Sequence, residues 1–292
     1  MIVQHPLRRG ERAFESEIAR HSGDETRVFK KAKGQELLLS LHYPAGYDPA
    51  GRYPLFVFVH GGGWQGRKVF PDQEAWSGDY LGFLARYYAD RGFLCAGIDY
   101  RLMREGGQAA GYEMMDLLED CMDAVEYLKD HADELGADPD RAAVIGESAG
   151  GHLAGMLATQ TDFFKTAVLV NPVTDFTDEK WNPLLPVRPR HPALKGVKRK
   201  DVINLFSPAR QVKPGTCPTL ILHGARDTVV NPKHAQAFYD AMTECGNEAA
   251  LHWIEDTDHA FLLAEYMQEL NRPLDAANIA VDVIDEWLKT HI

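Results

Sequence analysis

Short, continuous runs of apolar residues recur along the chain, and longer segments with helical periodicity separate them. Such runs are typical of strands that are buried on both faces of a parallel sheet. The runs that we expect to be strands are 54–59, 93–98, 142–145, 166–170, 218–224 and 248–254. Helices are expected between them, over 73–91, 115–135, 152–158, 232–245 and 276–289. Because this alternation requires crossover connections, the pattern predicts an α/β fold: a mainly parallel sheet with helices on both faces.

Three parts of the chain depart from this alternation. Residues 36–43 are leucine-rich and alternate, which indicates an early strand, and we expect the first strands to be antiparallel. Residues 1–35 are polar and are interpreted as an N-terminal segment, either a helix and loop over the active-site mouth or a frayed leader. Residues 174–212 are rich in proline and carry the basic cluster 195–200, so they are interpreted as a small lid insertion with a solvated basic surface. The prediction is one catalytic domain over 36–292 that contains this insertion.

Composition restricts the function classes further. A chain of 292 residues can bury a large core without disulfides or a metal. Its net charge of −12 argues against nucleic acid and against anionic membranes as partners. No apolar run approaches the ~20 residues of a membrane helix, and the N-terminus has no apolar core of a signal peptide, so a cytoplasmic location is expected. The four cysteines are widely spaced and are interpreted as buried free thiols.

The segment 146–150 reads G-E-S-A-G and lies between an apolar run and a small-residue helical pattern. A strand, a sharp turn and a helix in this order form a nucleophile elbow, in which the serine is strained and its hydroxyl is exposed above the sheet edge. Glycines are required there because a Cβ would clash in so tight a turn. We therefore predict that Ser148 is a nucleophile.

A serine hydroxyl needs a base to accept its proton and an acid to orient that base. Asp227 follows an apolar strand and is the candidate acid, while Asp256 and Asp258 compete with it and are interpreted as turn formers. His259 follows the last strand and is the candidate base, since the other histidines considered as rivals lie in predicted strands or helices. The order serine, acid, histidine is that of the elbow hydrolases.

The oxyanion of the tetrahedral intermediate needs fixed backbone N–H donors. The amide of Ala149, directly after the nucleophile, is one candidate. The others are Gly62 and Gly63, with Gly61 as a possible substitute, because the segment 60–63 reads H-G-G-G after a buried strand. His60 is interpreted as a structural hydrogen-bonding residue.

These motifs resemble those of serine esterases in the α/β-hydrolase superfamily. The HGGG of 60–63 and the GESAGG of 146–151 are similar to motifs of the hormone-sensitive-lipase-like group and of bacterial feruloyl and acetyl-xylan esterases. The strand end Asp99-Tyr100-Arg101 also resembles those groups, although Glu147 stands where hormone-sensitive-lipase relatives usually have aspartate. With Trp64, the form HGGGW is in addition similar to the HGGxW of kynurenine formamidases. The resemblance covers about residues 36–290 and implies an α/β-hydrolase fold.

The sequence thus predicts a serine carboxylesterase that acts on short-chain, acetyl-type esters through an acyl-enzyme, including esters of acetylated or feruloylated sugars. Trp64, Tyr100 and the segment 174–212 are expected near the substrate pocket. An arylformamidase or related amidase is the main alternative. An acyl-peptide hydrolase and a non-catalytic binding protein are weaker ones, since the chain has no room for a propeller and retains all three triad residues. No cofactor or metal is expected, the partner is a small ester, and the sequence does not indicate an oligomeric state.

Overall fold

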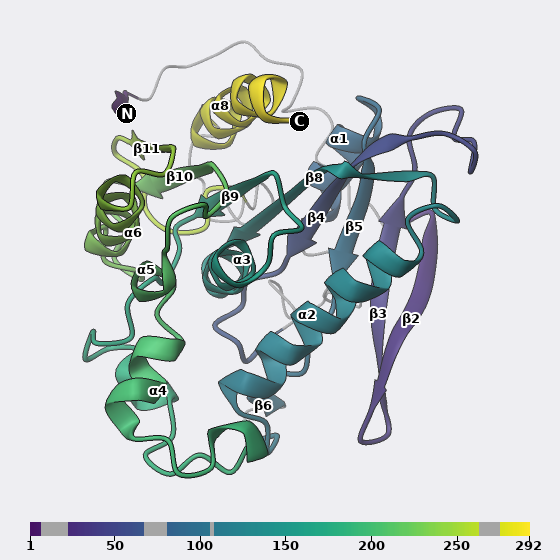
Figure 1. Ribbon diagram of the computed structural model, residues 1–292. Coiled ribbons are helices and arrows are strands. Elements are labelled where there is room, and N and C mark those ends of the chain that lie inside the picture. The colour runs from purple at the N-terminus through teal and green to yellow at the C-terminus, as the bar shows by residue number, and fades with distance from the viewer. Residues whose placement is uncertain (7–22, 67–80, 106–107, 263–274) are drawn as a thin grey trace.

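A twisted, mainly parallel sheet forms the centre of the protein (Figure 1). The computed structural model describes residues 1–6, 23–66, 81–105, 108–262 and 275–292. In this part of the chain the sheet has nine strands in the order β1-β11-β10-β9-β8-β4-β5-β3-β2. They are β1 (Ile2–His5), β2 (Glu25–Ala32), β3 (Gln35–His42), β4 (Tyr53–Val59), β5 (Leu94–Ile98), β8 (Ala137–Glu147), β9 (Thr166–Val170), β10 (Thr219–Gly224) and β11 (Ala249–Ile254). The short strands β6 (Arg104–Glu105) and β7 (Gln108–Ala109) pair separately.

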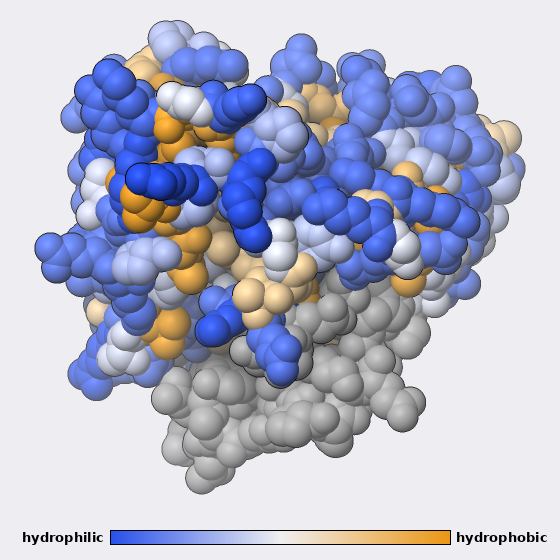
Figure 2. Space-filling view, turned by 90° about the horizontal axis from the view of Figure 1, so that it is seen from below, coloured by the Kyte–Doolittle hydropathy of each residue, from blue (hydrophilic) through white to orange (hydrophobic). Residues whose placement is uncertain are grey.

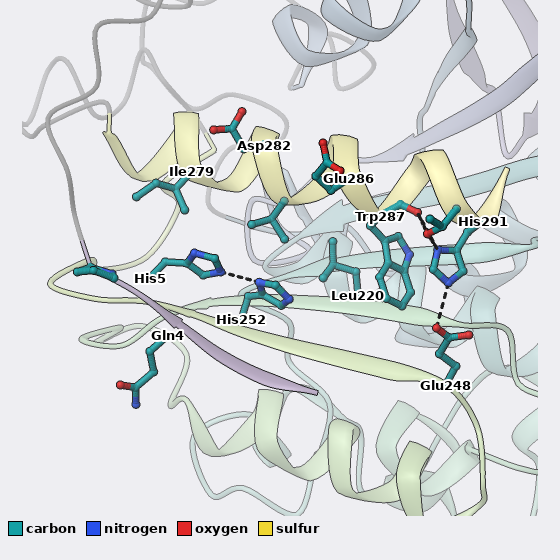
Figure 3. Close-up of a pocket in the computed structure, with 13 residues that line it drawn as sticks. Gln4, His5, Leu220, Glu248, His252, Ile279, Asp282, Glu286, Trp287 and His291 are labelled. Atoms are coloured by element: carbon teal, nitrogen blue, oxygen red, sulfur yellow. Dashed lines mark hydrogen bonds and ion pairs between the residues drawn. The ribbon is translucent and has the colours of Figure 1, made fainter.

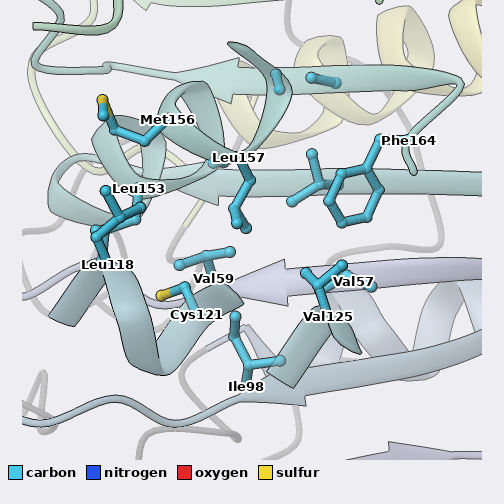
Figure 4. Packing of buried hydrophobic residues seen from close by; sticks show 14 of the residues in the cluster. Val57, Val59, Ile98, Leu118, Cys121, Val125, Leu153, Met156, Leu157 and Phe164 are labelled. Carbon is cyan, nitrogen blue, oxygen red and sulfur yellow. The ribbon is translucent and has the colours of Figure 1, made fainter. Parts of the chain in front are cut away.

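Helices cover both faces of the sheet, as the alternation predicted. They are α1 (Gly82–Ala89), α2 (Met114–Asp130), α3 (Ala149–Gln160), α4 (Arg199–Leu205), α5 (Pro208–Gln211), α6 (Lys233–Glu244) and α8 (Asp275–His291). Side chains alternate along β4: Val57 and Val59 belong to the cluster beneath α2, α3 and α6, while Phe56 and Phe58 belong to the cluster beneath α1 and α8. Figure 4 shows the first cluster, in which side chains of α2 and α3 pack on the central strands. The prediction of an α/β sheet with helices on both faces is therefore confirmed.

Among the early strands, β3 pairs antiparallel with both β2 and β5, as expected, whereas the first strand, β1, is parallel to its neighbour. Residues 1–35 are expected to form a helix and loop or a frayed leader. The described part of this segment instead forms β1 and β2, the edge strands at opposite ends of the sheet. Strand β1 pairs parallel with β11, and the terminal ammonium of Met1 donates to the carbonyl of Ala249. Residues 7–22 lie outside the described residues, so the prediction that this segment covers the active site stays a prediction.

The segment 138–141 reads D-P-D-R, which predicts a turn before the elbow strand, but in the structure it lies within β8. The register with β4 shifts from Asp138, opposite Pro54, to Ala142, opposite Leu55, so residues 139–141 bulge out of the ladder. The helix expected over 73–91 is described from Gly82 onward, and residues 73–80 lie outside the described residues.

The insertion at 174–212 leaves the end of β9 and contains two 3₁₀ turns (Asn182–Leu184 and Pro192–Leu194), followed by α4 and α5. Its tip is attached to the start of α2, where the backbone N–H of Arg190 donates to the Glu113 carboxylate. Figure 2 shows the lower face in the view of Figure 1, where the described surface is mostly hydrophilic and hydrophobic side chains appear between polar ones. The role of the insertion as a lid stays a prediction.

A cavity of about 650 Å³ lies between α8 and the strands β1 and β11 (Figure 3). The paired rings of His5 and His252 line one part of it, and Trp287 and His291 line another. None of its described lining residues is a site residue predicted from the sequence. In the described part of the chain, no helix has both the length and the apolar composition to cross a bilayer.

Candidate active site

The predicted site residues gather where parallel strands end. Ser148 follows β8, Asp227 follows β10, His259 follows β11, and the glycine loop 60–63 follows β4. Because the carboxyl ends of parallel strands share one edge of the sheet, four segments far apart in the sequence meet there.

Ser148 adopts the strained conformation expected of a nucleophile elbow, with φ 59° and ψ −119°. Close backbone packing enforces this turn. A Cβ at Gly146 would lie 2.2 Å from the carbonyl oxygen of Gly150, and a Cβ at Gly150 would lie 2.1 Å from that of Val59. Glycine at these two positions therefore allows α3 to begin directly against the end of β4.

Ser148, His259 and Asp227 form one hydrogen-bonded chain. The Oγ of Ser148 lies 2.8 Å from Nε2 of His259, and Nδ1 of His259 lies 2.7 Å from Oδ2 of Asp227. An ionised Asp227 can only accept, so Nδ1 carries the ring proton and Nε2 is left to accept from the serine hydroxyl. The arrangement can take a proton from Ser148 and hold the resulting positive charge beside a carboxylate.

The Asp227 side chain is fully buried and ionised. Burial alone would raise its pKa, but hydrogen bonds from His223 and His259, together with the charges of these rings, hold the pKa of Asp227 well below its usual range. Its other oxygen, Oδ1, accepts the backbone N–H groups of Val229 and Val230, each at 2.8 Å. These hydrogen bonds hold the carboxylate in position and stabilise its ionised form.

The loop of His259 is pressed against the end of β10. A Cβ at Gly224 would lie 2.6 Å from the carbonyl oxygens of both Thr257 and Asp258, so this glycine brings the acid and base loops together. Asp258 Oδ1 accepts the backbone N–H of His259 at 2.8 Å, a local bond that suits the interpretation of Asp258 as a turn former. Ala260 has φ 61°, an uncommon conformation for a residue with a Cβ.

The glycine loop lies beside the elbow. Gly62 and Gly63 have φ values of 93° and 63°, and a Cβ at Gly62 would lie 2.2 Å from the carbonyl oxygen of Gly66. Ala149 is the first residue of α3, so its N–H is one of the amides that the helix itself does not use. Contact between Gly150 and the backbone of His60 brings the loop and this helix start together. The geometry is compatible with an oxyanion hole of Gly62, Gly63 and Ala149, which stays a prediction.

Trp64 and Tyr100, predicted to line the pocket, are both 0% exposed. Trp64 donates its indole N–H to His152 and packs against Phe176. The Tyr100 hydroxyl donates to the carbonyl of His60 at 2.8 Å, and its ring stacks on the His60 ring. Both side chains support the glycine loop and its surroundings, while their contact with substrate stays a prediction.

Arg101 of the same strand end is structural rather than part of the site. Its guanidinium is buried and binds both oxygens of Asp120, at 2.7 and 2.8 Å, and one oxygen of Asp116. Lys30 also reaches Asp120, at 2.6 Å. This cluster joins the end of β5 to α2 and to β2.

We expect Asp120→Ala to lower the free energy of unfolding by about 3–5 kcal/mol, because it leaves the buried Arg101 charge without its main partner. Asp123→Ala is the matched control: Asp123 lies on the same helix and pairs with the same Lys30, but it is half exposed, so a change below about 1 kcal/mol is expected. Urea unfolding monitored by circular dichroism measures both. Equal losses from the two variants would contradict a special role for the buried pair.

Sequence reasoning missed two groups at the site. His223, seen only as a residue inside a strand end, places Nε2 3.3 Å from Oδ2 of Asp227. Glu147, noted only as a departure from a motif, is fully buried, and burial raises its pKa to about 7. The position of Glu147 directly before the nucleophile was the available signal, but its burial was not visible in the sequence.

The raised pKa of Glu147 carries a cost in stability. Its ordinary pKa of 4.5 applies to the unfolded chain, so between about pH 4.5 and 7 the unfolded state releases a proton that the folded state keeps. Folding stability therefore falls as the pH rises through this range. Above pH 7 the loss reaches about 3 kcal/mol. A residue that costs this much stability calls for an explanation at the site.

The fold and this arrangement define an α/β-hydrolase of the serine hydrolase class. A family model described as the prolyl oligopeptidase family matches residues 81–276, and the chain belongs to this family. Among solved structures, a thermophilic esterase of the planctomycete Thermogutta terrifontis is 26% identical over 91% of both chains, with a TM-score of 0.70.

Two curated relatives agree with this class. An AB hydrolase superfamily protein of Schizosaccharomyces pombe is 28% identical over 80% of this chain and 72% of its own length. The probable carboxylic ester hydrolase LipM of Mycobacterium tuberculosis is 27% identical over 73% of this chain and 51% of its own length, so the chain spans about half of that relative. The protein is thus a carboxylic ester hydrolase by class, and the predicted superfamily is confirmed.

Proposed function

We propose that the protein hydrolyses esters of short acyl groups, acetyl to butyryl, through an acyl-enzyme on Ser148. The observation that carries this proposal is the hydrogen-bonded chain Ser148–His259–Asp227 beside the glycine loop. His259 takes the serine proton as Oγ attacks the ester carbonyl, and then gives it to the leaving alcohol. Water attacks the acyl-enzyme next, with His259 again as the base, and the acid is released.

Backbone donors stabilise the charge that develops on the carbonyl oxygen. The N–H groups of Ala149, Gly62 and Gly63 would meet it, and the backbone conformation of the two glycines needs no rearrangement for this. Asp227 keeps the imidazole in the tautomer that accepts from serine and offsets its positive charge.

Two observations support a short acyl chain. The helices of the insertion are only seven and four residues long, which gives little apolar cover for a fatty chain. The related Thermogutta terrifontis esterase has been solved with propionate and with butyrate bound, at 27% identity and TM-scores of 0.68 and 0.67. The alcohol part, including acetylated or feruloylated sugars, remains a proposal that rests on motif resemblance.

A substrate panel tests this proposal. We expect kcat/KM for p-nitrophenyl esters to be highest between acetyl and butyryl and to fall for acyl chains of eight carbons or more. Acetylated xylose, methyl ferulate, N-formylkynurenine and an N-acetyl dipeptide form the other arms. Faster cleavage of N-formylkynurenine than of acetate esters would favour the arylformamidase alternative, and faster cleavage of the dipeptide would favour an acyl-peptide hydrolase.

With a histidine base, activity should also rise between about pH 5 and 8.

A further inference from the structure

Glu147 is a buried acid that the proposed mechanism does not use. It ends β8, its backbone pairs opposite Val170 of β9, and its side chain is 0% exposed. The strand does not need this side chain, because backbone atoms make the ladder. An apolar residue of similar size would fill the space without burying a carboxyl group.

One carboxyl oxygen of Glu147 contacts the loop that carries the base. Oε1 accepts the backbone N–H of Leu262 at 3.3 Å, three residues after His259. Between them, Ala260 has φ 61° and Phe261 is fully buried. The bond therefore ties the residue before the nucleophile to the end of a strained turn that begins at the base.

The other oxygen, Oε2, is buried and has no hydrogen-bond partner among the described residues. A buried acceptor without a partner is costly, so its presence in a native structure calls for an explanation. The Glu147 carboxyl group is therefore held by one hydrogen bond, to Leu262, and is poorly solvated.

We propose that Glu147 is a positioning residue of the reaction: it holds the His259 loop through Leu262, and its negative charge stabilises the imidazolium that forms when His259 takes the serine proton. This inference rests on the proposed triad. The hydrogen bond of Glu147 found among the described residues goes to Leu262, so we expect it to act through the orientation and the charge of His259.

The charges around the two groups support this role. His259 faces Asp227 across their hydrogen bond, and Nε2 of His223 lies 3.3 Å from the same carboxylate oxygen. The backbone N–H of His259 donates to Asp258. Burial raises the pKa of Glu147, the charge of His259 lowers it and that of Asp227 raises it, so the carboxyl responds to both triad partners. With the pKa of Glu147 at about 7, its charge is present in the upper part of the neutral range.

Glu147→Gln separates charge from contact, because the amide oxygen can still accept from Leu262 while the negative charge is removed. We expect kcat to fall about tenfold and the acid limb of the kcat/KM profile to move about one pH unit lower. The two effects match because an interaction that shifts a pKa by one unit corresponds to a tenfold change in an equilibrium constant. KM should change less than twofold. The melting temperature at pH 8 should equal or exceed that of wild type, because the cost of the buried charge is relieved.

Glu147→Asp keeps the charge and shortens the side chain by one methylene, so its acid limb should stay near that of wild type while kcat falls. Glu113→Gln is the matched control, a largely buried glutamate that also accepts backbone N–H groups, and it should leave the acid limb unmoved. In a Ser148→Ala background, NMR titration of the His259 ring should show the same downward shift on Glu147→Gln, without any need for turnover.

The proposal is overturned if Glu147→Gln matches wild type in kcat and pH profile, or if Glu147→Asp moves the acid limb as far as Glu147→Gln does. Failure of the proposed triad looks different. Ser148→Ala would then stay active, whereas a failure of the Glu147 role alone leaves Ser148→Ala inactive.

Discussion

Ser148→Ala is expected to lower kcat/KM for p-nitrophenyl acetate by at least about 10³-fold, because it removes the nucleophile of the proposed acyl-enzyme. Alanine keeps the Cβ at φ 59°, so the elbow is retained and the melting temperature should change by only a few degrees. Steady-state hydrolysis and differential scanning calorimetry measure the two effects.

A matched control lies at the other end of the same helix. The hydroxyl of Thr161 donates to the carbonyl of Leu157 at the C-terminus of α3, away from the elbow, so Thr161→Ala should retain activity within about twofold. Wild-type hydrolysis by Ser148→Ala would show that another group performs the chemistry. A second readout follows from the nucleophile itself: an organophosphonate should label the serine of wild type and leave Ser148→Ala unlabelled by mass spectrometry.

Asp227→Asn is expected to lower kcat by about 10⁴-fold, since an amide facing Nδ1 favours the wrong tautomer of His259. The asparagine oxygen can still accept from Val229 and Val230, so the loop should keep its shape. Asp256→Asn is the control: Asp256 is exposed, pairs with Arg226 and has φ 54°, a conformation that asparagine tolerates. Its activity should equal that of wild type.

The rival acid is tested in the same assay. Asp258 accepts the backbone N–H groups of His259 and Thr228, whereas Asp227 accepts from the imidazole ring itself, so Asp258→Asn should cost far less than Asp227→Asn. A larger loss from Asp258→Asn would contradict Asp227 as the acid of the triad.

Local patterns in the sequence determined much of the sheet. The apolar runs at 54–59, 166–170 and 218–224 match β4, β9 and β10 within about a residue. Strands buried on both faces leave this signal because both sides of the ladder need apolar side chains. The elbow was equally visible, since a glycine on either side of the serine is a local steric requirement.

Elements that depend on distant partners were less visible. The edge strand β1 has only four residues, none of them fully buried, and it forms by pairing with β11 some 250 residues away. The sequence indicates a turn at 138–141, but only pairing with β4 makes these residues a bulge within a strand.

The sequence by itself determined the alternation of the central strands and helices, the elbow at Ser148, and the candidates Asp227 and His259, because each leaves a local pattern of apolar residues or glycines. Tertiary structure alone decided that His223 lies beside Asp227, that Arg101 binds Asp120, and that Glu147 is sealed beneath the His259 loop. Burial and charge pairing are properties of the space between elements. The same glutamate in the printed sequence could equally be a solvated surface residue, and only the packing of β8 against the loop after β11 makes it a buried acid next to the base.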